Sequence, residues 1–455
     1  MEELRILSPT AILGYGFPMK SFEEGMRRHP HVIAVDAGST DPGPYYLGAG
    51  ISFTDRTAVK RDLGIMISAA LEEDIPVIIG SAGGSGGEPH LEWNVQIVME
   101  IAKEKGMQFK TAVIHAEIDK DYILKKMDEG KVYPLHPAPE LSKEELERTD
   151  RIVGQMGIEP FIKALEQDVQ VIIAGRAYDP VVFASLAVQK GYDRGLAIHL
   201  GKILECASIA ATPGSGSDCM MGYLGEDYFN VEPLNPVRKC TTLSVAAHTL
   251  YEKTNPYILP GPGGVLDLTN TEFTQETDNM VKVSGSKFIQ SEEYTIKLEG
   301  AKKIGYRTVS IAGTRDPIMI AQIDEVLQGV RERVEDNFSD SQMEYFLDFR
   351  VYGRNGVMGA LEPQQEITSH ELGIIIEVVA QDQATANTIC SFTRSTMLHY
   401  GYQGRIATAG NLAFPYSPSD LKAGEVYTFN LYHVVEVDDP NELFPMEIMT
   451  MGGSV

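Results

Sequence analysis

Short apolar runs alternate with helix-like patterns through the first half of the chain. These runs are continuous rather than alternating with polar residues, which is typical of parallel strands covered on both faces. Small and polar residues follow each run, and α/β proteins bind ligands beyond the carboxyl ends of such strands. We therefore predict a doubly wound, mainly parallel α/β sheet. Its expected strands are residues 11–13, 32–35, 77–79, 111–114 and 169–174.

The last third of the chain has a different order of elements. Strand-like and helical segments follow one another there as β-α-β-β-α-β, which is the order of the ferredoxin-like α+β fold. A turn rich in Pro and Gly at 260–264 precedes it. We expect an α/β sheet domain over 1–260, connecting strands over 261–300 and a ferredoxin-like domain over 301–455. The ferredoxin-like segments are 307–312, 318–334, 345–352, 373–380, 382–399 and 427–435.

Charge and cysteine content narrow the class of protein. The 455 residues carry a net charge of −25, which argues against binding to nucleic acid or to an anionic membrane. The four cysteines form no Cys-x-x-Cys pair, so neither a zinc ribbon nor a disulfide framework is expected. The chain has no apolar signal region at its start and no run of about 18 apolar residues. We expect a cytoplasmic protein that binds neither membranes nor nucleic acid.

A glycine-rich loop stands between the expected strand 77–79 and a helix with apolar residues at helical spacing. Glycine allows positive φ angles and lets a ligand approach the main chain. The helix would add unpaired N–H groups and its positive dipole end, so we expect a small anionic substrate or a CoA ester to bind here. The alternative is a flexible connector. The loop lacks the Gly-Lys-Ser/Thr of a P-loop. Its candidate binding residues are Ser81, Gly83, Gly84, Ser85, Gly86 and Gly87.

Groups that can transfer protons or bind an anion stand close to this loop in the predicted fold. Glu88 and His90 follow it directly, and one would act as a base while the other acts as an acid. Arg176 follows another strand and offers a guanidinium group suited to a carboxylate or a phosphate. Asp179 precedes a proline at a helix start, where N-capping accounts for it, and it is also a candidate catalytic acid or base.

Asp36 and Ser39 follow a third strand. Together with Asp41 they present oxygen atoms that could hold a divalent cation. Asp and Gly are also ordinary turn residues, so we favour a turn or the binding of a substrate hydroxyl group. No cofactor is identified from the sequence, and a divalent cation at Asp36 stays open. His115 and Glu117 end a further strand, where a buried, hydrogen-bonded histidine is the common outcome.

Several segments together resemble the acyclic terpene utilisation AtuA-like family. They are 80–93, 174–180, 247–257 and 297–308, and the resemblance covers about residues 7–435. The family takes its name from a gene cluster that degrades branched terpenoid acids as CoA thioesters. The resemblance is to its shorter members, which implies a separate small subunit as a partner, and we also expect a homo-oligomer. It supplies no catalytic residues that can be transferred to this chain.

Two functions fit these features. The first is a lyase of the hydratase type that acts on a small carboxylic acid or its CoA thioester. Elimination of water beside a carbonyl needs a base, an acid and donors for the enolate oxygen, and the loop residues could supply all three. The second is a non-catalytic or co-catalytic subunit that binds CoA or phosphate and needs a small partner protein. An ATP-dependent ligase is less favoured because neither a Gly-Lys-Ser/Thr motif nor a pair of arginines that would hold a phosphate is visible.

Overall fold

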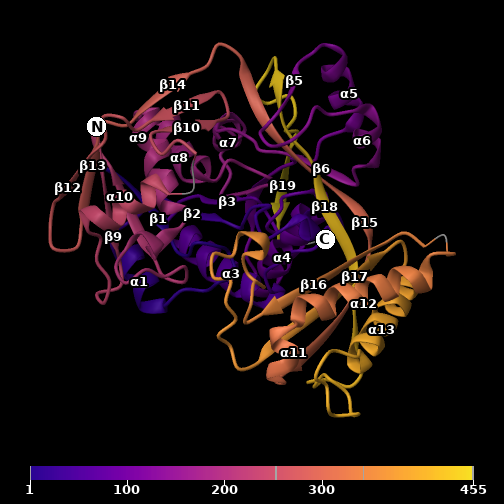
Figure 1. Ribbon diagram of the computed structural model, residues 1–455. Helices are drawn as coiled ribbons and strands as arrows, with labels where there is room; N and C mark the ends of the chain where they lie inside the picture. Colours follow the sequence, from indigo (N-terminus) through magenta and orange to yellow (C-terminus); the bar gives the residue numbers. More distant parts are fainter. Residues whose placement is uncertain (1, 252–253, 342, 453–455) are drawn as a thin grey trace. The chain divides into compact units, whose positions relative to one another are not determined.

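The computed structural model describes residues 2–251, 254–341 and 343–452, and it confirms the α/β class. The chain forms two compact units (Figure 1). Unit 1 contains Met1–Lys302 and Phe429–Val455, and unit 2 contains Lys303–Thr428. Two long strands, β15 (Tyr294–Thr314) and β18 (Asp420–Val437), begin in one unit and end in the other.

A ten-stranded sheet is the centre of unit 1 in the described residues. Its five middle strands are parallel, and antiparallel strands extend the sheet on both flanks, so the parallel part is confined to the centre. The parallel strands lie in the order β1 (Leu4–Ser8), β2 (Val32–Asp36), β3 (Val77–Gly80), β7 (Val171–Ala174) and β4 (Phe109–Ile114). The antiparallel strands are β8 (Met220–Leu224), β9 (Tyr228–Pro233), β13 (Val281–Ser284) and β12 (Glu272–Gln275) beyond β1, and β19 (Met446–Met451) beyond β4.

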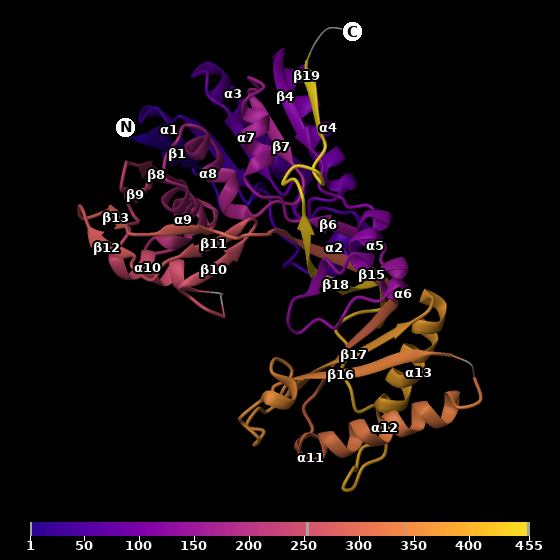
Figure 2. The same ribbon diagram turned by 90° about the horizontal axis from the view of Figure 1, so that it is seen from above.

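Both faces of this sheet are covered by helices, as predicted for a doubly wound fold (Figures 1 and 2). Successive residues of a strand point to opposite faces. In β2, Ile33 and Val35 join one apolar core, whereas Val32 and Ala34 join the other. Because both sets are buried, the strand has no polar position before Asp36 at its end. The first core is covered by α1 (Met19–Arg27), α3 (Arg56–Glu72) and α4 (Glu88–Lys105), and the second by α7 (Glu159–Leu165), α8 (Asp179–Gln189) and α9 (Arg194–Leu204).

The strand expected at residues 11–13 is wrong. The first strand is β1, and residues 11–13 belong to the loop that follows it. The main-chain N–H of Ala11 donates to Gly216 O and that of Leu13 donates to Asp36 O, so this apolar segment bonds to neighbouring loops. The side chains of Ala11 and Leu13 are buried there, which accounts for the apolar character of the segment without a strand.

The remaining elements of unit 1 are short. In unit 1, β15 pairs with β6 and β18 pairs with β5. A separate three-stranded sheet has the order β10-β11-β14. These elements are α2 (Pro44–Ala49), α5 (Lys120–Asp128), β5 (Val132–Pro134), α6 (Lys143–Arg148), β6 (Arg151–Gly154), the 3-10 helix η1 (Ala207–Ala210), α10 (Thr242–Leu250), β10 (Ile258–Gly261), β11 (Gly264–Asp267) and β14 (Lys287–Gln290).

Unit 2 has the predicted ferredoxin-like order. Its strands lie in the sequence β16-β17-β15-β18, with β17 antiparallel to both neighbours. Apolar residues of the helices, such as Val330 and Ile389, pack with Val351 and Ile376 of the strands in one core. The elements between the two long strands are α11 (Pro317–Ala321), α12 (Ile323–Phe338), β16 (Tyr345–Tyr352), η2 (Gly359–Leu361), β17 (Leu372–Ala380) and α13 (Gln383–His399).

Candidate functional site

Loops that follow four parallel strands meet at the carboxyl edge of the unit 1 sheet. Asp36 lies opposite Gly80, and Ile114 opposite Ala174, so these strands end at the same level. The glycine-rich loop 81–87 is bonded directly to the segment after β7. Ser81 N–H donates to Gly175 O at 3.0 Å, and Arg176 N–H donates to Gly86 O at 3.1 Å. The glycine loop, Arg176 and Asp36 therefore share one edge.

The glycines of this loop are required by close packing as well as by backbone conformation. All of residues 81–87 are buried. Gly84 has φ +97°, and a Cβ there would lie 2.5 Å from Cε1 of Phe53. Gly86 has φ +69°, and a Cβ there would lie 2.1 Å from the main-chain nitrogen of Arg176. Ser81 itself adopts φ +48°, a conformation that side chains rarely take. The loop is thus a rigid, packed turn and not a flexible connector.

Several polar atoms of this loop have no protein partner. In the described part of the chain, the N–H groups of Gly83, Ser85, Gly86 and Gly87 donate no hydrogen bond. Ser85 Oγ is fully buried and also lacks a partner among the described residues, as does Oδ1 of Asp36. Buried polar groups normally have a partner. This concentration of unpaired donors and acceptors at one sheet edge is what a ligand-binding site requires.

The surroundings of Asp36 favour the protonated form of its carboxyl group. Burial raises the pKa of its carboxyl group well above the usual range, and the nearby charges of Asp179 and Glu205 add to this effect. Arg176 and the N–H group of Gly38 oppose the rise in pKa. A protonated carboxyl group can donate a hydrogen bond or act as a general acid.

Arg176 is held by a buried network. Its Nε lies 2.8 Å from Oε2 of Glu299, and its Nη1 lies 2.7 Å from Oδ1 of Asp179 and 3.1 Å from Oγ of Ser81. Lys297 Nζ lies 2.6 Å from the other oxygen of Glu299. Burial alone would raise the pKa of Glu299, but Arg176 and Lys297 overcome burial and lower it to about 2. Within the described residues, Arg176 Nη2 makes no hydrogen bond, so this nitrogen remains for a ligand.

The N-capping role expected for Asp179 is wrong. Tyr178 occupies the N-cap of α8, no side chain caps that helix, and Asp179 stands in its first turn. The Asp179 carboxylate pairs with Arg176 instead, because a buried guanidinium group needs a charged partner. A negative charge in the first turn still complements the helix dipole.

The N-terminus of α4 is already occupied by a carboxylate of the protein. The N–H of Glu88 donates to Oε2 of Glu117 at 2.7 Å, and Glu117 also pairs with Arg151 Nη1 at 2.6 Å. Glu88 turns its own carboxylate to His115, with 2.9 Å between Oε2 and Nδ1. The helix end therefore does not offer free N–H groups to a ligand, and Glu88 contacts His115 rather than His90.

His90 is buried directly behind the glycine loop. Its Nε2 lies 3.0 Å from the carbonyl oxygen of Tyr46. A Cβ on Gly83 would lie 2.7 Å from Cβ of His90, and one on Gly87 would lie 3.4 Å from its Nδ1. Burial lowers the pKa of His90 to about 4, although hydrogen bonding to the carbonyl groups of Tyr46, Ile51 and Gly87 acts to raise it. The imidazole is therefore neutral at neutral pH.

Ser39 forms a local turn, since its Oγ accepts the N–H of Asp41 at 3.1 Å. Asp41 itself is exposed. No group of three or more His, Cys, Asp or Glu side chains suited to a metal ion occurs within residues 2–251, 254–341 and 343–452. Cys219 is buried next to β8, and burial raises the pKa of its thiol well above the ordinary range, so it is not an activated nucleophile.

Some residues of this network were given no role from the sequence. Lys202 of α9 and Glu205, the C-cap residue of that helix, form a buried ion pair at 2.8 Å, and Glu205 acts on the pKa of Asp36. Glu299 lies in a strand in which polar and apolar residues alternate, so from the sequence it is expected on the exposed face of the sheet. The sequence therefore does not indicate that it binds Arg176. Two residues of the 247–257 segment, Glu252 and Lys253, lie outside the described residues.

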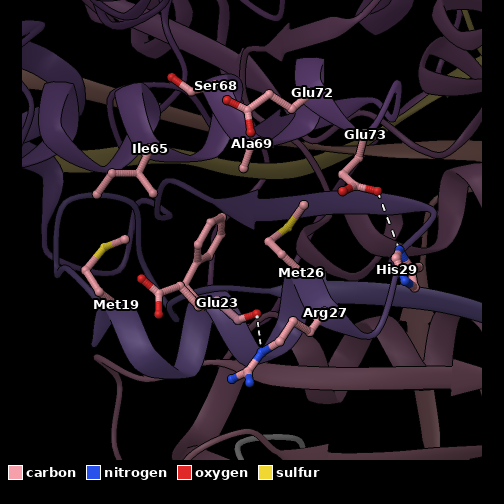
Figure 3. Close-up of a pocket in the computed structure, with 11 residues that line it drawn as sticks. Met19, Glu23, Met26, Arg27, His29, Ile65, Ser68, Ala69, Glu72 and Glu73 are labelled. Atoms are coloured by element: carbon pink, nitrogen blue, oxygen red, sulfur yellow. Dashed lines mark hydrogen bonds and ion pairs between the residues drawn. The ribbon is translucent and has the colours of Figure 1, made fainter.

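A groove of about 780 Å³ lies elsewhere in unit 1, between α1 and α3 (Figure 3). Met26 and Ile65 are among its apolar lining residues, and His29 pairs with Glu73 at its rim at 3.5 Å. No residue of the candidate site lines it. The groove therefore gives no reason to move the candidate site away from the carboxyl edge.

The fold and these loops define an α/β protein with a candidate small-molecule site at the carboxyl edge of parallel strands. A family model described as acyclic terpene utilisation family protein AtuA matches residues 55–218 and 237–417, which together make up most of the chain. The chain belongs to this family, as its motifs predicted. The matched regions include Ser85, Arg176 and Glu299, whereas Asp36 precedes them.

No curated protein and no solved structure matches the chain. Among the described helices, none combines the length and the apolar character that crossing a bilayer requires.

Proposed function

We propose that this protein is a hydro-lyase that adds water to, or removes it from, a small carboxylic acid or its CoA thioester. The observation that carries the proposal is a pair of carboxyl groups with different environments at one sheet edge. Asp36 is buried with a raised pKa, whereas Asp179 is paired with Arg176 at 2.7 Å. In many enzymes, two nearby carboxyl groups in such different surroundings serve as the acid and the base of the reaction.

In the direction of elimination, the base takes the proton beside the carbonyl group and leaves an enolate. The enolate electrons then form the carbon–carbon double bond as the carbon–oxygen bond breaks. Asp36 gives its proton to the departing hydroxyl group, which leaves as water. Asp179 offers its Oδ2 as the base, since Arg176 holds its Oδ1. His90 and the Glu88–His115 pair remain further candidates for proton transfer.

Donors for the enolate oxygen come from the glycine loop. The N–H groups of Ser85 and Gly86, the hydroxyl of Ser85 and Nη2 of Arg176 have no acceptor among the described residues. Preorganised donors of this kind stabilise negative charge as it develops. Ser81, Gly83, Gly84 and Gly87 shape the turn that presents them.

The same N–H groups suit phosphate oxygens, which favours a second candidate function. In that case the chain is a subunit that binds CoA or phosphate, and a small partner protein is needed for the chemistry. The two proposals differ in what the isolated chain does: the hydro-lyase turns over by itself, whereas the binding subunit only binds.

The test uses purified protein with 2,3-unsaturated and 3-hydroxy carboxylic acids, both free and as CoA thioesters. Water addition or loss is followed by the change in mass of one water, and affinity by calorimetry. Asp36→Asn keeps the shape of the side chain, so it should retain binding and lose roughly 10²–10⁴ in rate. Ser85→Ala should weaken binding by about 10-fold, which corresponds to one hydrogen bond.

Ser339→Ala is the matched control, because this exposed serine lies in unit 2 and its hydroxyl donates to Asp336 O. Full turnover in Asp36→Asn removes Asp36 from the mechanism. Binding of CoA thioesters without turnover of any substrate supports the binding subunit instead. If the isolated chain shows no binding and no turnover, that result contradicts both proposals.

A further inference from the structure

Helix α4 carries two buried polar residues on one face. His90 is 1 % exposed and Asn94 is fully buried, and four residues separate them, so they are neighbours on one face of the helix. The other buried residues of this helix include Leu91, Ile97 and Val98, which join the apolar core beneath α4. The two polar side chains thus interrupt an otherwise apolar contact.

Three polar atoms of these side chains have no protein partner within the described residues. They are Nδ1 of His90 and both Nδ2 and Oδ1 of Asn94. Thr111 of β4 adds a buried hydroxyl without a partner there. Thr111 points to the same face of the sheet as Val113, which belongs to the core that α4 covers. Four unpaired, buried polar atoms therefore belong to α4 and to the face of β4 that it covers.

An unpaired amide in a core costs free energy, and leucine has a similar volume without this cost. Buried water is the usual partner of such groups, because one molecule can bond to several of them. The atoms here can bond to water in a consistent pattern. Asn94 supplies N–H donors and an oxygen acceptor, and Thr111 supplies a hydroxyl that does both.

The contact of His90 with Tyr46 fixes the remaining hydrogen-bond direction. A carbonyl oxygen only accepts, so the Nε2 that lies 3.0 Å from Tyr46 O carries the proton. In a neutral imidazole the other nitrogen, Nδ1, is then an acceptor. Nδ1 also faces Gly87 of the glycine loop.

We propose that water bound between α4 and the sheet links Nδ1 of His90 to the amide of Asn94 and the hydroxyl of Thr111, which makes Asn94 a positioning residue for His90. The water donates to Nδ1 and accepts from Asn94. This arrangement holds His90 as the Nε2–H tautomer. The water site stands on the unpaired buried atoms alone, whereas its contribution to turnover rests on the proposed function.

Two variants of one position test this inference. Asn94→Leu keeps the volume and removes both hydrogen-bonding groups, and Asn94→Ser keeps a hydroxyl group and leaves more room for water. The exposed Met99→Leu on the same helix is the matched control. The main readout is the ¹⁵N resonance of His90 Nδ1, assigned by its loss in His90→Gln. Crystal structures of the wild type and of Asn94→Leu give the second readout.

The wild type, Asn94→Ser and Met99→Leu should show a hydrogen-bonded Nδ1, and the wild-type crystal should show water beside Asn94. Asn94→Leu should fold, lose the water and shift Nδ1 to the position of a bare nitrogen. Its kcat should fall about 10- to 100-fold at unchanged KM, as for other buried partners of a working histidine. An unchanged Nδ1 resonance in Asn94→Leu, or a dry wild-type site, overturns the inference. Lack of turnover in the wild type would contradict the proposed function but not the water site.

Discussion

Arg176 and Glu299 form a buried ion pair that joins the end of β7 to β15 within unit 1. Their side chains are each 3 % exposed, 2.8 Å separates Nε from Oε2, and 123 positions separate the residues in the sequence. Lys297 binds the second oxygen of Glu299, and Asp179 binds Nη1 of Arg176. Glu299 is the fully buried counter-charge of both Arg176 and Lys297, so its removal leaves the partly buried Asp179 as the remaining charged partner of Arg176.

Replacing Glu299 with Gln should lower the free energy of unfolding by about 3–5 kcal/mol, because Arg176 would lose its fully buried counter-charge. The measurement is urea-induced unfolding followed by circular dichroism. The control is Asp128→Asn in the exposed Lys143–Asp128 pair, whose distance is also 2.8 Å. That pair should contribute about 0–1 kcal/mol. Equal effects of the two substitutions would show that burial of the Arg176–Glu299 pair does not matter for stability.

Gly86 and Gly106 have nearly the same backbone conformation and differ in their surroundings. Their φ angles are +69° and +63°, but a Cβ on Gly86 would meet Arg176, whereas nothing lies within 4 Å of one on Gly106. Gly106→Ala should therefore cost about 1 kcal/mol of unfolding free energy from conformation alone. Gly86→Ala should cost about 1–3 kcal/mol more from steric overlap. Thermal unfolding of both variants checks this, and similar Tm values would contradict the packing of the glycine loop.

The strands at the centre of the sheet could be predicted from sequence because both of their faces are buried. The runs that contain Val32–Asp36, Val77–Gly80 and Val171–Ala174 have no polar position before their ends, which is the pattern of strands covered on both faces. The segment at 11–13 is equally apolar but bonds to Gly216 and Asp36, and only these distant partners distinguish it from a strand. The return of β18 and β19 to unit 1 likewise depends on long-range pairing that no local pattern shows.

Asp36 should make stability depend on pH. Its folded-state pKa is raised above the ordinary value of 3.8, so its stabilising contribution is complete below that value and is lost as pH rises toward the folded-state pKa. Asp36→Asn should therefore gain stability over the wild type as pH rises from about 4, by up to roughly 1.4 kcal/mol per pH unit. Urea unfolding at a series of pH values measures this difference. A difference that stays constant with pH would mean that Asp36 titrates normally.

His199 should produce the opposite dependence. Burial lowers the pKa of this histidine to about 3, and its ring lies 2.6 Å from Ser286 Oγ and 3.1 Å from Thr249 Oγ1. The unfolded chain takes up the proton near the ordinary pKa of 6.5, so the wild type should lose stability as pH falls from 6.5 toward 3. His199→Gln should be less stable than the wild type at pH 8, and this gap should narrow in acid. A gap that widens instead would require a charged His199 in the folded state.

The candidate site was predictable only in outline. Ser85 and Arg176 follow separate strands, and the geometry of a parallel sheet brings such loops to one edge. The sequence did not show that Glu117 would occupy the start of α4 or that Glu88 would turn to His115, because both contacts depend on side-chain direction. The raised pKa of Asp36 could not be predicted either, since it depends on burial beside Asp179, which spacing along the chain does not encode.

Unit 2 is inserted between two parts of unit 1, and this has a consequence for synthesis on the ribosome. Strand β19 pairs with β4, yet all of unit 2 lies between them in the chain. During translation the β4 edge of the large sheet therefore stays unpaired until the whole of unit 2 has been synthesised. Unit 2 has its own core and can fold in that interval. An open edge strand is a template for pairing with other chains, so nascent molecules are most exposed to misassociation before β19 emerges.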